Sequence, residues 1–280
     1  MNLEPWDTVS LGDDLPMIIR GIQWLLRARG HVVATDGVFG PITRTAVQDF
    51  QTAQALPLTG DVDEVTWLRL VWPSGPGSAG DAVRAVQQFG LPRWVDDEPL
   101  AVDGNFGPKT EERVRHFQAS WGLAQDGWAG RETWSFLQAF RPGHRLWPLV
   151  RPGATETTNR RVRAVQLLLR HHGSAIAADG MYGPLTGEAV RQWQLTQRAL
   201  YISTTVGQLD WPGLIATCRN GDHGDHVRAV QSLLSGVIVD GHFGPITEAA
   251  VRSLQDVFLP PADGIVGPDT WHLLVVPLFD

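Results

Sequence analysis

One hexapeptide pattern occurs four times along this chain: DGVFGP at residues 36–41, DGNFGP at 103–108, DGMYGP at 179–184 and DGHFGP at 240–245. In every copy a Gln follows the Asp by 15 positions, as Gln51 follows Asp36. Such repetition at a constant spacing is the signature of a chain built from repeated structural units. The sequence therefore predicts four copies of one unit.

The residues around each hexapeptide repeat as well. A Gln lies upstream of every copy and a Trp lies downstream: Gln23 and Trp67, Gln87 and Trp134, Gln166 and Trp211, Gln231 and Trp271. Apolar residues recur three or four positions apart, which is the spacing of one face of a helix and not the alternation of a strand. The pattern predicts three short helices in each copy, and so an all-α fold made of a tandem array of four small three-helix modules.

Segments rich in Gly and Pro mark where one copy ends and the next begins. WPSGPGSAG at 72–80 separates the first two copies, and RPGHRLWPLVRPGATE at 141–156 separates the second from the third. We place module 1 at 1–74, module 2 at 75–141, module 3 at 151–217 and module 4 at 218–280. Module 1 has a degenerate start, with Pro16 where its first helix should begin, and module 3 has a degenerate end, where YISTTVGQLDW replaces a second Asp-Gly turn.

Local chemistry accounts for most of the hexapeptide. Asp36 can close an Asx turn, Gly37 can adopt a positive φ, and the aromatic Phe39 can enter the core. Pro41 suits the first turn of a helix, with Gly40 or Thr43 as the cap. The repeated Gln residues are expected to brace these loops, because an amide both donates and accepts hydrogen bonds. The third position of the pattern varies, so its side chain can change the surface without changing the fold.

Charge and hydropathy limit the functions that the chain can have. The formal net charge is −7, and Lys and Arg are scattered, which argues against nucleic acid as a partner. No apolar stretch is long enough to span a bilayer, so we expect no membrane span. The first residues, MNLEPWDTVSLGDD, lack the pattern of a secretory signal. We therefore expect either a cytoplasmic protein or one in the cell wall or outside the cell, after loss of a leader or by non-classical export.

Three motifs could in principle carry chemistry. GPGSAG at 75–80 has the spacing of a dinucleotide-binding loop, but a helix precedes it where that site needs a strand, so a linker is favoured. GDHGDH at 221–226 could bind zinc, although Asp222 or Asp225 is more simply the N-cap of the next helix. Cys218 has no His in a catalytic pattern nearby. We expect no catalytic residues, no metal and no cofactor.

The fourth copy contains VRAVQSLL, DGHFGPIT, AVRSLQ and DGIVGPDTWHLL. Together these segments resemble the peptidoglycan-binding-like domain, and the resemblance covers nearly the whole chain. It implies a small three-helix module that is commonly fused to wall hydrolases and transferases and that holds wall peptide or glycan in a shallow crevice between helices without catalysis. Modules 1 and 3 depart from the pattern, so modules 2 and 4 are the better candidates for binding.

The twelve Trp residues divide into two groups. Trp193 and the four third-helix Trp residues lie on repeat positions and are expected in the core, whereas others lie off the pattern and could stack on a ligand or seal contacts between modules. Our candidate ligand-binding residues are Trp94, Asn105, Trp121, Asp126 and Trp128 in module 2, and His242 and Asp263 in module 4.

Two functions remain open at this point. The first is non-catalytic binding of bacterial cell wall, to the stem peptide or the glycan of peptidoglycan, with avidity from the repeated modules. The alternative is a structural adaptor or scaffold whose modules contact a protein partner, which the acidic composition favours. An enzyme that degrades the wall would need a catalytic constellation, and the sequence offers none that we recognise.

Overall fold

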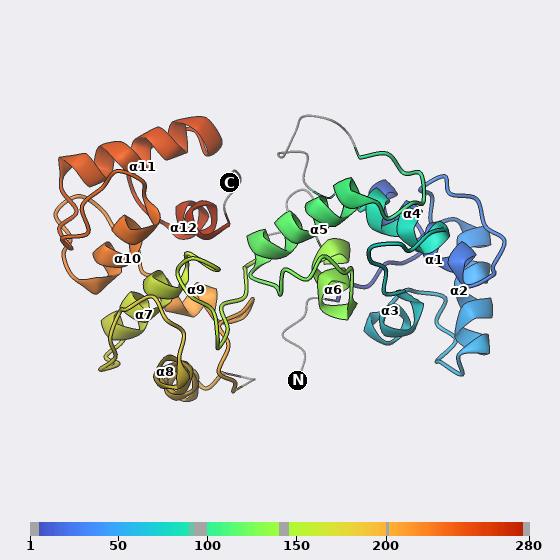
Figure 1. Cartoon of the computed structure of the whole chain (residues 1–280), viewed down its shortest axis with the longest axis horizontal. Coiled ribbons are helices and arrows are strands. Elements are labelled where there is room, and N and C mark those ends of the chain that lie inside the picture. The colour runs from blue at the N-terminus through green and yellow to red at the C-terminus, as the bar shows by residue number, and fades with distance from the viewer. Residues whose placement is uncertain (1–5, 90, 92–99, 140–145, 200–201, 277–280) are drawn as a thin grey trace. The chain divides into compact units, whose positions relative to one another are not determined.

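The computed structural model describes residues 6–89, 91, 100–139, 146–199 and 202–276. These residues form helices and isolated antiparallel bridges, with no β-sheet among them, which confirms the all-α prediction (Figure 1). No described helix is both long enough and apolar enough to cross a membrane. The helices fall three to a module: α1 Pro16–Ala28, α2 Pro41–Ala53, α3 Glu64–Leu70; α4 Asp81–Gln88, α5 Pro108–Trp121, α6 Arg131–Ala139; α7 Val162–His171, α8 Pro184–Thr196, α9 Trp211–Leu214; α10 Asp225–Leu233, α11 Pro245–Phe258, α12 Pro268–Val275.

The third helix of each module anchors the core through its Trp. All four of these Trp side chains are fully buried, and Trp193 is 5% exposed. The indole nitrogen of each third-helix Trp donates to a carbonyl in the segment that leads into its own module, as Trp134 does to Trp72 at 3.2 Å and Trp271 to Ala216 at 2.7 Å. The module is therefore closed by a hydrogen bond between its two ends, and the prediction that these Trp residues are core is confirmed.

The hexapeptide forms the turn that the sequence predicts. The Val38 amide donates to Asp36 Oδ1 at 2.9 Å, and Gly37 has φ of 80° with no room for a Cβ, which would lie 2.8 Å from the Pro16 carbonyl oxygen. Phe39 is 2% exposed. Gly40 is the N-cap of α2 and Pro41 its first residue, whereas the hydroxyl of Thr43 bonds to the turn and does not cap the helix.

The two degenerate modules differ in how much they depart from the pattern. Helix α1 begins at Pro16 and is 13 residues long, so the proline serves as an N1 residue and costs module 1 no helix. In module 3, α9 has only 4 residues. Because the second Asp-Gly turn is missing there, the Gln194 side chain donates instead to the buried carboxylate of Asp210. The degeneracy is real in module 3 alone.

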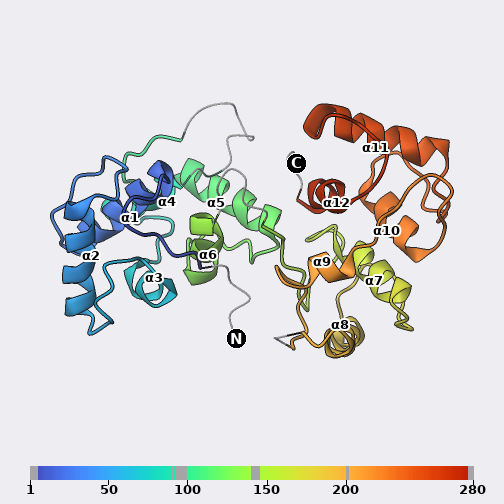
Figure 2. The ribbon, with the colours of Figure 1, turned by 180° about the vertical axis from the view of Figure 1, so that it is seen from behind.

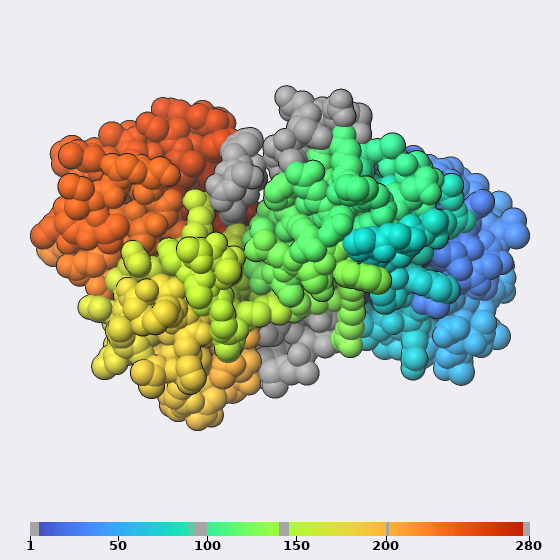
Figure 3. Space-filling view, viewed as in Figure 1, coloured from blue at the N-terminus to red at the C-terminus, as the bar shows by residue number. Residues whose placement is uncertain are grey.

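The modules are associated in pairs. The chain divides into two compact units: one contains the described residues between 6 and 119 and between 123 and 146, and the other contains residues 120–122 and the described residues between 147 and 276. Within the first, α1 of module 1 packs against α4 of module 2; within the second, α7 of module 3 packs against α10 of module 4, and Figure 2 shows the same neighbours from behind. Space-filling atoms of modules 1 and 2, blue and cyan to green, are in direct contact (Figure 3).

Equivalent residues join the helices of both pairs. Arg27 of α1 forms an ion pair with Asp81 of α4 at 3.1 Å, and Arg170 of α7 with Asp225 of α10 at 2.9 Å. Between modules 1 and 2, the Phe89 ring packs edge-on against the third-helix Trp of each module. Its centroid lies 6.4 Å from that of Trp67 and 5.3 Å from that of Trp134. The core of module 1 is thus continuous with that of module 2.

Candidate functional site

A buried Gln in the first helix of each module holds the hexapeptide turn. In module 2 the amide nitrogen of Gln87 donates to Asp103 Oδ1 at 2.9 Å, to the Asn105 carbonyl at 3.1 Å and to the Thr110 hydroxyl at 3.3 Å, while its oxygen accepts from the Gly104 amide at 2.9 Å. Gln23, Gln166 and Gln231 make the same four contacts in their modules. The prediction that these Gln residues brace the loops is confirmed.

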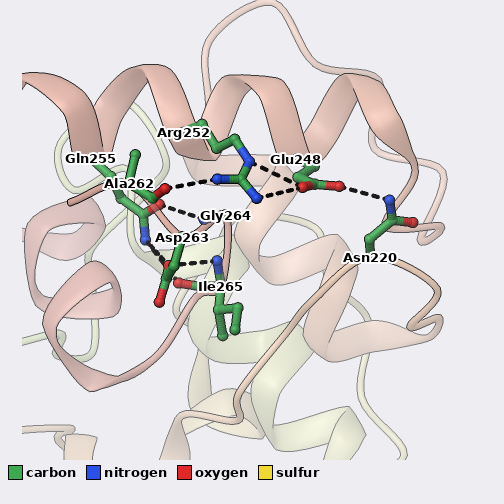
Figure 4. A network of polar contacts seen from close by, with 8 residues as sticks. All are labelled: Asn220, Glu248, Arg252, Gln255, Ala262, Asp263, Gly264 and Ile265. Atoms are coloured by element: carbon green, nitrogen blue, oxygen red, sulfur yellow. Dashed lines mark hydrogen bonds and ion pairs between the residues drawn. The ribbon is translucent and has the colours of Figure 1, made fainter. Parts of the chain in front are cut away.

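A second Gln, in the second helix, holds the turn that precedes the third helix. Figure 4 shows it in module 4, where the amide nitrogen of Gln255 donates to Asp263 Oδ1 at 2.8 Å and to the Ile265 carbonyl at 2.9 Å, and its oxygen accepts from the Gly264 amide at 2.8 Å. Beside it, Arg252 bridges Glu248 and the Ala262 carbonyl at 2.9 and 2.7 Å. Module 4 therefore contains two turns that are each clamped by a Gln side chain.

The carboxylates of these turns are structural groups. Donation by the turn amide and by the Gln side chain lowers the pKa of Asp103, and the same two causes, with the amide first, lower the pKa of Asp36, Asp179 and Asp240. The pKa of Asp263 is lowered chiefly by the hydrogen bond from the Ile265 amide. In each case one carboxylate oxygen is occupied by the turn, so only the other is presented to solvent.

The third residue of each turn points outward. In the first turns these residues are Val38, Asn105, Met181 and His242, all exposed, and in the second turns Trp128 and Ile265 are 47% and 36% exposed. An exposed Ile or Leu follows four positions after Val38, Met181 and His242, at Ile42, Leu185 and Ile246, with exposures of 73–80%. Each module therefore presents a variable residue on a rigid turn, next to the start of its second helix.

The candidate residues from the sequence divide between these turns and the core. Asn105, Trp128 and His242 are third residues of turns and are exposed, and the carboxylates of Asp126 and Asp263 close their turns by accepting from the backbone amide two positions on. Ligand contact by these five stays a prediction. Trp121 is only 4% exposed, and its carbonyl accepts from the Leu149 amide at 2.9 Å, so its ring is a packing element. Trp94 lies outside the described residues.

The GDHGDH segment serves the pairing of modules 3 and 4. Neither acid is the N-cap of α10, since that position is Gly224; Asp225 instead forms ion pairs with Arg170 and Arg228, both at 2.9 Å. The His171 and His226 rings lie 4.5 Å apart at the same helix pair. Among the described residues, no group of three or more His, Cys, Asp or Glu side chains is placed to hold a metal ion.

Cys218 precedes this segment in the chain and is fully buried. Its sulfur contacts the Ala216 carbonyl at 3.4 Å and the His226 carbonyl at 3.7 Å. Burial is the main cause that raises the pKa of the thiol to about 12, which keeps it protonated and unreactive at neutral pH. The cysteine thus behaves as a small core residue.

Comparison with known families agrees with this geometry. The peptidoglycan binding domain matches the chain four times, at residues 19–70, 79–137, 158–199 and 223–274, once in every three-helix module. The chain belongs to the peptidoglycan binding domain family. The clamped turns described above are therefore the four-fold repeated core of this domain, and the resemblance inferred from module 4 extends to the degenerate modules 1 and 3.

Three curated relatives match part of the chain, and two of them are named as enzymes. A zinc D-Ala-D-Ala carboxypeptidase of Streptomyces albus G is 37% identical over 41% of this chain and 43% of its own length. An N-acetylmuramoyl-L-alanine amidase, CwlL of Bacillus licheniformis, is 28% identical over 41% of this chain and 33% of its own. A 59-residue stretch is 48% identical to half of an uncharacterized protein of Kitasatospora aureofaciens. The chain spans half or less of each relative, and no solved structure matches it significantly.

Proposed function

We propose that this chain attaches to peptidoglycan through its four modules and does not itself break wall bonds. The observation that carries the proposal is that the family domain matches all four modules, each with its hexapeptide turn held by the same Gln contacts. The relatives named as a carboxypeptidase and an amidase support a wall ligand. They share less than half of their length with this chain, so their catalytic activities are not transferred to it.

Because the module is repeated, the array can bind the wall tightly even if each module binds it weakly. When one module is bound, the next is held near the wall at a high effective concentration, so that the affinity of the array can exceed that of one module by roughly 10²–10⁴. The turn residues exposed in each module, such as Asn105, Trp128 and His242, are the surface that we assign to wall contact.

The test is co-sedimentation of the full chain with insoluble peptidoglycan, with cellulose as a control polysaccharide that lacks amino sugars. We expect saturable binding to peptidoglycan alone, weakened in Trp128→Ala and unchanged in Val32→Ala, which removes an exposed apolar side chain (95%) of the same unit that belongs to none of the clamped turns. Turbidity of the wall suspension should stay constant during incubation. A chain that remains in the supernatant would refute wall attachment, and a fall in turbidity would refute the non-catalytic part.

A structural adaptor is the second candidate. The observation in its favour is the apolar character of the turns in modules 1 and 3, where Val38 and Ile42 are 60% and 73% exposed and Met181 and Leu185 are 61% and 80% exposed. Exposed apolar clusters on a folded domain often mark protein contacts. Failure of wall binding together with retention of a protein partner, lost in Met181→Asp, would favour this function over the first.

A further inference from the structure

A pocket of about 200 Å³ lies between modules 1 and 2, inside one compact unit. Its walls come from the end of α1, the segment that follows α3, the linker that leads into α4, and the first two residues of α4. The lining residues used below are Ala28, Trp72, Ser74, Ser78, Asp81 and Ala82. Because both modules contribute, a single module does not contain this pocket.

Trp72 gives the pocket an aromatic wall that is held in place. The residue is 43% exposed, and the Arg29 guanidinium lies 4.5 Å from the centroid of its ring. The same guanidinium donates to the three consecutive carbonyls of residues 69–71, at 2.7, 3.3 and 2.9 Å. An exposed indole fixed in this way loses little conformational freedom when a ligand stacks on it.

Each charged side chain named beside the pocket already has a polar partner. One Asp81 oxygen accepts from Arg27 at 3.1 Å and the other from Arg84 at 2.7 Å. Arg29 is committed to the carbonyls at the end of α3. A ligand carboxylate or ammonium would have to compete with these contacts, so the lining favours a neutral ligand.

Hydroxyl groups complete the lining. Ser78 Oγ accepts from the Gly75 amide at 3.1 Å, which leaves its hydroxyl hydrogen available to a ligand, and Ser74 donates to the Trp72 carbonyl at 3.2 Å. An aromatic wall next to neutral polar groups suits a ligand with one apolar face and a rim of hydroxyls, as a pyranose ring has. The pocket is smaller than the roughly 300–1,000 Å³ that encloses a drug-sized molecule, which limits it to one such ring.

We propose that this pocket binds one neutral sugar residue of the wall glycan, an N-acetylated amino sugar stacked on Trp72. The proposal rests on the proposed function, because it names the part of peptidoglycan that one unit recognises. It assigns glycan contact to the junction of modules 1 and 2, beside the turns of module 2, since the pocket residues Ser74 and Ala79 form backbone bridges with Ala129 and Asn105.

The second unit has different residues at the aligned positions. His171 and His226 stand where the first unit has Ala28 and Ala82, and Ala216 stands in place of Trp72. The two imidazoles lie 4.5 Å apart across the helix pair. The small residues that open the pocket are thus replaced by large ones and the aromatic wall is absent, so the sugar site belongs to modules 1 and 2 alone.

The test is calorimetric titration of the full chain with tri-N-acetylchitotriose, a soluble neutral oligomer of N-acetylglucosamine. Trp72→Ala removes the stacking wall, and Ala28→His introduces the residue that the other unit carries at this helix position. We expect each variant to bind at least about tenfold more weakly, which corresponds to about 1.4 kcal/mol. Ala53→His is the matched control, since Ala53 is likewise the last residue of its helix but does not line the pocket, and it should bind like the unaltered chain.

The outcomes separate this proposal from the one on which it rests. Binding of the trisaccharide that is lost in both pocket variants and kept in Ala53→His supports the site, provided that thermal melts show all variants folded. If the chain sediments with peptidoglycan but does not bind the trisaccharide, or if Trp72→Ala binds it normally, the sugar site is refuted and wall attachment stands. If the chain binds neither ligand, both proposals fail.

Discussion

The contact between Gly21 and Phe89 gives the sharpest test of how the first two modules are joined. A Cβ built on Gly21 would lie 1.9 Å from an edge carbon of the Phe89 ring, far inside van der Waals contact. Phe89 is fully buried against Trp67 and Trp134, so its ring cannot move aside freely. Gly21→Ala should therefore destabilise this unit although alanine favours helix, because overpacking costs about 1–3 kcal/mol and outweighs the gain of up to roughly 1 kcal/mol in helix propensity.

The other unit supplies the compensating change. At the aligned positions modules 3 and 4 have Ala164 and Leu233, a larger residue facing a smaller one. The double variant Gly21→Ala with Phe89→Leu should therefore be more stable than the sum of the two single effects, with a coupling of about 1 kcal/mol or more between these contacting residues.

Calorimetric melting of the full chain and hydrogen exchange measure these effects. A loss of 1–3 kcal/mol would lower the transition of the first unit by about 3–9 °C. Exchange should speed up for amides of α1 and α4, while those of α7 and α10 serve as the internal control. A shift under about 1 °C in Gly21→Ala, or additive effects in the double variant, would show that the ring edge does not limit the approach of these helices.

Three further predictions concern the modules themselves. Gln255→Leu should lower the free energy of unfolding by about 2–4 kcal/mol, because it removes four hydrogen bonds and leaves their buried partners unpaired. Replacement of an exposed residue, Gln192→Leu, should change the free energy of unfolding by under about 0.5 kcal/mol. Equal effects of the two substitutions would refute the clamp. Burial is the main cause that lowers the pKa of His171 and His226 in the folded chain. The second unit should therefore lose stability as the pH falls below the unfolded pKa of 6.5 and through the lower folded pKa values. Substitution of both His residues by Ala should flatten this pH dependence in denaturant titrations. Cys218 should react with a thiol reagent at pH 8 only after unfolding, and rapid labelling of the native chain would contradict its burial.

The interior of each module could be predicted from sequence because its determinants are local and repeated. Asp36, Gly37 and Pro41 lie within six positions of one another and specify a turn followed by a helix. The Gln contacts, though more distant in sequence, recur at the same positions in every module. Fourfold repetition let one interpretation be checked against three other copies.

Features that arise between modules escaped prediction for a physical reason. The approach of α1 to α4 depends on which side chains meet across the junction, and neither Gly21 nor Phe89 belongs to the repeated pattern. Trp121 and Trp72 were both placed off the pattern, yet one is 4% and the other 43% exposed. Pro16 was placed at the start of the first helix and interpreted as a degenerate feature of module 1, whereas it is the N1 residue of a 13-residue helix. Exposure at such positions is decided by packing partners that periodicity does not identify.

The pairing of first helices has a consequence for where a ligand can bind. The apolar faces of α1 and α4 are buried against each other, as are those of α7 and α10. These faces are therefore not accessible to a ligand. What stays exposed is a set of clamped turn tips, whose third residues differ from module to module. The pocket beside Trp72 is added only where the paired helices end in small residues. Under the proposed function, binding specificity depends on how each pair is joined as well as on what each module carries, and the proposed sugar site distinguishes one pair from the other without any change in the three-helix fold.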